Sequence, residues 1–170
     1  MNNRKVYISG DIVPEVDAKI SIFDSAVLLG DTVTESTRTF NFKPFKLDEH
    51  LERLYKSFKL TRIDPQMTIE EMKKVSLELL EINKDDYKVN EDCWLVHNIS
   101  RGHSITGGNP ALQVSKPTVM IYTQPMNLVL WAPFYTKGCH AVTPPTRMVP
   151  SQSLDARIKN RSRLFYTLAE

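Results

Sequence analysis

Two amphipathic helical stretches stand side by side in the middle of this chain, with strand-like segments before and after them. The first is predicted to run to Leu60 with Asp48 as its capping residue. The second begins at the capping box Thr68-Ile-Glu-Glu and continues with apolar residues at helical spacing as far as Ile82. This order of elements predicts an α+β unit in which antiparallel strands pack against two helices.

The segments around the helices have the residue pattern of strands. Residues 5–14 predict two short strands joined by a Gly-Asp turn, and residues 93–102 and 117–124 predict a further pair. Together they make residues 1–123 a small α+β domain. We expect a proline-containing connection at 124–132 and the beginning of a second domain at 133–170, with another strand at 138–150 and a helix from Arg163 onward.

The strand predicted from Thr32 to Phe40 carries polar side chains on both of its faces. Thr32, Thr34, Ser36 and Arg38 share one face, and the other face carries Val33, Glu35, Thr37 and Thr39. Such a strand suits the wall of a polar cavity. An exposed edge strand explains the same pattern equally well.

Composition narrows the class of protein. The 170 residues include 22 lysines and arginines against 20 acidic residues, and this net charge of +2 argues against a dedicated nucleic-acid-binding protein. The two cysteines form no CxxC pair, and no signal-like apolar run follows Met1, so we expect a reducing, cytoplasmic setting. No segment approaches the ~20 apolar residues of a membrane span, and the four histidines lack the spacing of metal ligands.

A local cluster of cations stands out against this balanced composition. In the segment 154–166, basic residues occupy every second position at Arg157, Lys159, Arg161 and Arg163. The cluster is open to three interpretations: an arm for a polyanion, a solvated strand edge, or a place where one cation does chemistry.

Three stretches taken in order resemble a known family. They are LLGDTVTESTRTFNFKPFKLDEHLERLYKS (28–57), NISRG (98–102) and LDARIKNRSRL (154–164). This set is similar to the fold type IV (class IV) pyridoxal-phosphate aminotransferases, a group that includes branched-chain and D-amino-acid aminotransferases, (R)-amine transaminases and aminodeoxychorismate lyases. The resemblance implies a two-domain enzyme, of which this chain carries the small N-terminal domain and the start of the larger cofactor-binding domain. It also implies that the chain is truncated, because the acidic partner of the pyridine nitrogen lies further on.

The resemblance assigns roles to individual residues. Lys159 matches the Schiff-base lysine, which also shuttles a proton between substrate carbon and cofactor. Arg53 matches the arginine that contacts the cofactor phosphate, although helix spacing alone favours a surface pair with Glu49. Glu35 and His50 match positions that support these groups.

Substrate-binding positions follow the family less closely. Thr34 stands where many relatives have an aromatic ring, which predicts a wider and more polar pocket, and Arg38 and Arg101 are candidates to contact substrate. The D-amino-acid enzymes carry an Arg-x-His pair where this chain has Thr106 and Gly108, which weakens that specificity.

The resemblance therefore predicts a homodimeric aminotransferase that uses pyridoxal 5'-phosphate to move an amino group between an amino acid or amine and a 2-oxo acid. Two alternatives remain at this point. One is a lyase of the aminodeoxychorismate type, suggested by Arg163-Leu164 after the lysine, and the other is a non-catalytic dimerisation or binding module. Neither a nucleic acid, a membrane nor a metal is expected as a partner.

Overall fold

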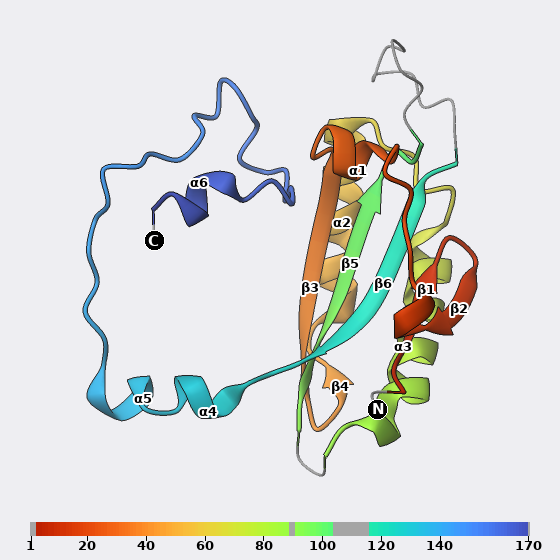
Figure 1. Ribbon diagram of the computed structural model, residues 1–170, viewed down its shortest axis with the longest axis horizontal. Coiled ribbons are helices and arrows are strands. Elements are labelled where there is room, and N and C mark those ends of the chain that lie inside the picture. Colours follow the sequence, from red (N-terminus) through yellow and green to blue (C-terminus); the bar gives the residue numbers. More distant parts are fainter. Residues whose placement is uncertain (1–2, 89–90, 104–115, 170) are drawn as a thin grey trace.

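The computed structural model describes residues 3–88, 91–103 and 116–169. Six strands form one antiparallel sheet in the order β2-β1-β6-β5-β3-β4, and two long helices cover one of its faces (Figure 1). This arrangement confirms the predicted α+β class. The strands are β1 (Lys5–Ile8), β2 (Asp11–Pro14), β3 (Thr32–Phe40), β4 (Lys43–Pro44), β5 (Cys93–Ser100) and β6 (Thr118–Pro125).

The long strands pair in a register that sets which side chains face the helices. β3 pairs with β5 from Thr32↔Ser100 to Arg38↔Trp94, and β5 pairs with β6 along its whole length. In the first of these pairings Glu35 lies opposite His97. Most residues of β3 are buried, and its other side is bonded by β4 and by the backbone of residues 159–161. β3 is therefore not an exposed edge strand, which overturns one of the two interpretations of its polar faces.

The two helices pack their apolar stripes against the sheet. α2 (Leu47–Thr61) and α3 (Ile69–Asn83) supply much of the hydrophobic core, together with apolar residues from β5 and β6. Burial of these side chains provides the main driving force for the fold. The core members with no exposed surface are Leu51, Leu54, Met72, Leu79, Cys93, Leu95, Ile99 and Ile121.

The two helix starts differ in how well the sequence predicts them. At α3 the capping box is present in full, because Thr68 Oγ1 accepts from Glu71 N and the Glu71 carboxylate accepts from Thr68 N. At α2 the prediction that Asp48 caps the helix is wrong. Lys46 occupies the capping position in a left-handed conformation with φ 55°, and Asp48 lies inside the first turn.

A buried carboxylate ties the start of β6 to the end of β5. Asp24 caps the short helix α1 (Ser25–Leu28) by accepting from Ala26 N. Its Oδ1 also accepts from Ser100 Oγ at 2.7 Å, and its Oδ2 accepts from Thr118 Oγ1 at 2.5 Å. One side chain thus holds together two neighbouring strand ends that are well separated in the sequence.

Beyond β6 the chain runs away from the sheet and then returns to it (Figure 1). It forms three short helices, α4 (Leu128–Trp131), α5 (Phe134–Lys137) and α6 (Leu164–Thr167). The strand predicted at 138–150 is wrong, since these residues form no strand. Pro144, Pro145 and Pro150 explain the difference, because proline has no N–H to donate to a ladder. Two 3-10 turns, Glu15–Asp17 and Lys84–Asp86, complete the secondary structure of the described residues.

Candidate active site

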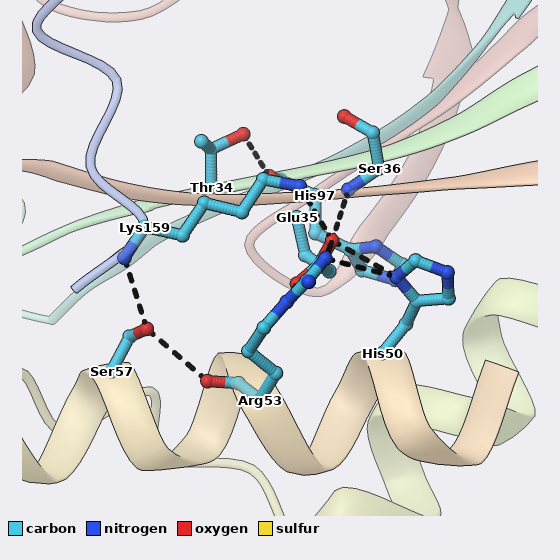
Figure 2. A network of polar contacts seen from close by, with 8 residues as sticks. All are labelled: Thr34, Glu35, Ser36, His50, Arg53, Ser57, His97 and Lys159. Carbon is cyan, nitrogen blue, oxygen red and sulfur yellow. Dashed lines mark hydrogen bonds and ion pairs between the residues drawn. The ribbon is translucent and has the colours of Figure 1, made fainter. Parts of the chain in front are cut away.

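A buried glutamate on β3 is the centre of the candidate site. Glu35 is fully buried and its side chain points from the sheet toward α2 (Figure 2). Helical spacing brings His50, Arg53 and Ser57 from successive turns of α2 onto the face that looks at this strand. Two elements that the core holds rigidly therefore bring an acid and two basic groups together.

The Glu35 carboxylate accepts hydrogen bonds from several donors. Arg53 donates to both of its oxygens, from Nε to Oε2 and from Nη2 to Oε1, each at 2.6 Å. His50 Nδ1 lies 3.0 Å from Oε1, and Ser36 N donates to the same oxygen at 2.9 Å. His50 Nδ1 also lies 3.3 Å from Arg53 Nη2, and since a carboxylate only accepts, the shorter contact with Glu35 requires a proton on Nδ1. Arg53 thus pairs with Glu35 and not with Glu49, which pairs with Lys46.

Lys159 reaches the same carboxylate from a distant part of the chain. Its Nζ donates to Glu35 Oε1 at 2.7 Å across a sequence separation of 124 residues. The backbone around it is attached to β3, because Thr34 N donates to Lys159 O and Arg161 N donates to Thr32 O, both at 2.9 Å. Lys159 N also donates to Ser57 Oγ at 3.3 Å. The lysine is positioned by the strand and the helix that also hold Glu35 and Arg53.

These contacts set the charge state of the site. Burial raises the pKa of Glu35, but hydrogen bonds from Arg53 and Lys159 outweigh this effect and hold the pKa at about 2. The hydrogen bond with Glu35 in turn raises the pKa of Arg53 above its ordinary value. Near neutral pH the site therefore holds one carboxylate among cationic donors.

His97 lies behind this network and was not singled out by the sequence. Ser76 Oγ donates its one proton to Met72 O at 2.7 Å, so His97 Nε2 donates to Ser76 Oγ, also at 2.7 Å. His97 Nδ1 has no hydrogen-bond partner among the described residues. Burial lowers the pKa of His97 to about 4, which keeps the ring neutral. The sequence predicts that His97 lies in a strand. It does not give the strand register that places His97 opposite Glu35, so it offers no signal for a role in the site.

A cavity of about 290 Å³ opens beside the lysine and the arginine. Lys159 and Arg53 line it, together with Asn160, Arg163 and Tyr166. The Lys159 side chain is 27% exposed and that of Arg53 is 51% exposed, so both reach the cavity from the buried carboxylate. With Arg157 and Asp155 also in the lining, the cavity presents one amine and three guanidinium groups against a single carboxylate, which suits an anionic ligand.

The three predicted substrate residues have other neighbours. Thr34 is buried, and its Oγ1 donates to His97 O at 3.0 Å on the opposite face of β3 from Glu35. Arg38 stacks its guanidinium 3.9 Å from the centroid of the Phe40 ring. Thr34 contacts Lys159 through its backbone N–H, which donates to Lys159 O.

Arg101 holds the end of α2 in place. Its Nε donates to Asp31 Oδ2, and its Nη1 and Nη2 donate to the carbonyl oxygens of Arg62 and Thr61, all at 2.7 Å. Contact with the last carbonyls of a helix is a favourable position for a cation. These contacts do not group Arg101 with Glu35 or Lys159. Thr106 and Gly108, which bear on D-amino-acid specificity, lie outside the described residues.

The described part of the chain carries neither a cluster of metal ligands nor a membrane span. Among residues 3–88, 91–103 and 116–169, no three histidine, cysteine or acidic side chains gather in a group that could hold a metal ion. None of the helices in these ranges is long and apolar enough to cross a membrane.

Comparison with known proteins identifies the family of this chain. The model of the family described as amino-transferase class IV matches residues 32–170, which include β3, α2 and the lysine segment. The chain belongs to the class IV aminotransferase family.

The curated relatives are named for different substrates. The chain is 35% identical over 166 residues to a protein of Methanocaldococcus jannaschii named "Putative branched-chain-amino-acid aminotransferase", covering 98% of this chain and 54% of that protein. It is 32% identical over 120 residues to a D-alanine aminotransferase of Staphylococcus epidermidis, covering 71% of this chain and 41% of that protein. The chain thus spans about half the length of these relatives, or less.

Solved structures share the fold. A branched-chain amino acid aminotransferase of the organism abbreviated T.th., solved with pyridoxamine 5'-phosphate, superposes with a TM-score of 0.80 at 24% identity, over 93% of this chain and 51% of that one. A branched-chain aminotransferase of Thermoproteus uzoniensis with norvaline gives 0.71 at 25% identity, over 92% and 51%. The architecture is therefore the N-terminal portion of a fold type IV enzyme, as the sequence predicted.

Proposed function

We propose that this chain is the first portion of a pyridoxal-phosphate-dependent aminotransferase, in which Lys159 holds the cofactor covalently and Arg53 binds its phosphate. One observation carries the proposal. The Lys159 amine and the Arg53 guanidinium meet on one buried carboxylate and line the same cavity, although they lie far apart along the chain. Membership of the class IV family gives this pair its chemical meaning.

The residues present fit two ends of the cofactor. A primary amine at the mouth of a cavity suits the aldehyde carbon, and a guanidinium already oriented by a carboxylate suits a dianionic phosphate. When bound, pyridoxal phosphate supplies the electron sink that makes bond breaking at the substrate carbon possible. A solved relative of similar fold carries pyridoxamine 5'-phosphate, which supports this choice of cofactor.

The chain's own residues would divide the remaining work. Lys159 Nζ, once free of the cofactor, can take a proton from the substrate's α-carbon or return one to it. Arg53 fixes the phosphate end while Glu35 fixes Arg53. Thr34, Arg38 and Arg101 remain candidate contacts for substrate, and His50 remains a supporting residue through its bond to Glu35.

Amino transfer is favoured over lysis as the reaction. The relatives described above are named as aminotransferases, for branched-chain amino acids and for D-alanine, which supports an amino acid and a 2-oxo acid as the substrate class. We propose the division into a small domain at 1–123, a connection at 124–132 and the start of a larger domain at 133–170. A homodimer and a cytoplasmic location, expected from the sequence and the resemblance, stay predictions.

The test is reduction with borohydride in the presence of pyridoxal phosphate, followed by peptide mapping. We expect a single reduced adduct on Lys159, and none in the matched variant Lys159→Arg, which keeps the charge but loses the nucleophilic amine. An adduct on another lysine of the wild-type protein, with none on Lys159, would contradict the proposal. Amino transfer without pyruvate release would separate the transaminase from the lyase.

A further inference from the structure

The Glu35 carboxylate is unusual in how its donors are distributed. Four of them approach the single oxygen Oε1: Arg53 Nη2 at 2.6 Å, Lys159 Nζ at 2.7 Å, Ser36 N at 2.9 Å and His50 Nδ1 at 3.0 Å. Each oxygen of an ionised carboxylate offers about two lone-pair directions. Oε1 therefore has more donors than lone-pair directions. If one donor leaves, the buried carboxylate is still fully hydrogen-bonded.

The four donors are not equally able to leave. Ser36 N belongs to the residue next to Glu35, and Arg53 is held by a second bond from its Nε to Oε2. His50 is fixed to α2, which packs in the core. Lys159 is the one donor carried by the segment outside the sheet and the two long helices, and its side chain lines the cavity. Its long flexible stem lets the amine move while the backbone stays bonded to β3.

Removing the acid has a different effect from removing the lysine. Without Lys159, Glu35 keeps its two bonds from Arg53 and those from Ser36 and His50. Without a charge on Glu35, the Lys159 amine and the Arg53 guanidinium would face one another with no anion between them, and like charges at this distance repel. The Glu35 carboxylate is thus necessary to hold the cations together, whereas the Lys159 amine can bind to it and leave it.

We propose that Glu35 is a docking site for the Lys159 ammonium, holding it beside the cavity whenever the amine is not bound to the cofactor, and that Arg53 keeps the carboxylate in place when the amine leaves. Glu35 is in this sense a positioning residue for both cations. The inference rests on the proposed function for its catalytic meaning. The docked state itself is a property of the cofactor-free protein and can be measured there.

The test is competitive acetylation of the cofactor-free full chain with acetic anhydride, read by mass spectrometry as the labelling rate of Lys159 divided by that of Lys137. Lys137 is exposed and lies at the end of α5, away from the network, so it reports the intrinsic rate of a solvated lysine. In wild-type protein we expect Lys159 to label ~3- to 10-fold more slowly than Lys137, since an ion pair of this kind withdraws the free amine. Equal rates in the wild type would overturn the proposal without any variant.

Two substitutions separate charge from packing. Glu35→Gln keeps the shape of the side chain and removes its charge, whereas Glu35→Asp keeps the charge and shortens the side chain by one methylene. We expect the Lys159 labelling ratio to rise to that of a solvated lysine in Glu35→Gln and to stay nearer the wild-type ratio in Glu35→Asp. The opposite order, with Glu35→Gln like the wild type, would show that Glu35 acts through packing and would overturn the docking role.

A matched pair of substitutions tests which of the two cations can leave the carboxylate. This test does not depend on the folding of the Glu35 variants. Lys159→Met and Arg53→Met each remove one cation from the same carboxylate. We expect Arg53→Met to lower the melting temperature of the cofactor-free chain more than Lys159→Met, because only the arginine bonds both oxygens. The reverse order would contradict the inference. Failure of borohydride to label Lys159 would, in contrast, remove the proposed function and leave the docking contact standing.

Discussion

The chain has two regions that differ in how their residues are held. Up to Met126, sheet and helices bury an extensive apolar core. From residue 127 to 169, every residue is exposed or only partly buried. Lys159 belongs to the second region, yet its position is fixed by two backbone bonds to β3, one to Ser57 and one to Glu35. The site therefore takes its geometry from the first region, to which a sparsely packed segment is attached at a few points.

Truncation of an apolar side chain should have very different effects in the two regions. Leu51 on α2 is fully buried, whereas Val142 is 85% exposed. We expect Leu51→Ala to lower the free energy of unfolding by ~2–5 kcal/mol, through lost burial and the cavity left behind. Val142→Ala should change it by less than ~0.5 kcal/mol. Urea denaturation measures both, and similar losses would show that the second region is packed as firmly as the first.

Acidification should distinguish the regions through two histidines. His97 is buried with its pKa held at about 4, against about 6.5 in an unfolded chain. Between these values the unfolded state binds a proton that the folded state does not, so stability falls as pH falls through this window and levels off below pH 4. From pH 6.5 to 4.5 the loss should be on the order of 2–3 kcal/mol. Glu35, with its pKa lowered from 4.5 to about 2, adds a further loss only below this range, as pH falls from 4.5 toward 2.

The measurement is the free energy of unfolding by urea at several pH values between 6.5 and 4.5. His97→Gln retains an N–H donor for Ser76 Oγ and should flatten the slope in this window. His140→Gln, in the exposed region, is the matched control and should leave the slope unchanged. A wild-type slope that persists in His97→Gln would assign the pH dependence to another group.

The smallest expected effect concerns the attachment between the two regions. Arg161 N donates to Thr32 O, so Arg161→Pro removes this donor, whereas Arg161→Ala keeps it and removes only the side chain. We expect Arg161→Pro to weaken cofactor capture by ~3- to 10-fold, the range that one hydrogen bond represents, with little change in unfolding free energy. Arg161→Ala should bind as the wild type does. Spectrophotometric titration with pyridoxal phosphate measures the affinities, and equal weakening in both variants would point to the side chain instead.

Local signals predicted the first region well. The capping box at Thr68 places the start of α3, and alternation from Thr32 to Phe40 gives both faces of β3 correctly. These features depend on neighbouring residues, so the sequence contains them directly. The predicted start of α2 at Asp48 is wrong, because the capping residue is Lys46 with a positive φ. A positive φ is uncommon for lysine, so the sequence does not predict it.

Features that depend on distant residues were less accessible. Without the structure, Arg53 and Glu49 are a plausible helix pair, because the competing partner Glu35 lies on another element. The position of His97 beside Glu35 depends on strand register, which the sequence does not specify. Lys159 was found only by resemblance, since nothing in a run of alternating cations marks one of them as the residue that reaches a buried acid.

The Asp24 junction has a consequence for how such a chain can vary over evolutionary time. The Asp24 carboxylate binds Ser100 at the end of β5 and Thr118 at the start of β6. The two ends of the connection between these strands are therefore held by a residue outside it. Insertions and deletions in that stretch cost little entropy when its ends are already fixed. A lineage could therefore change the length and chemistry of this connection while the sheet, and with it Glu35, stays where it is.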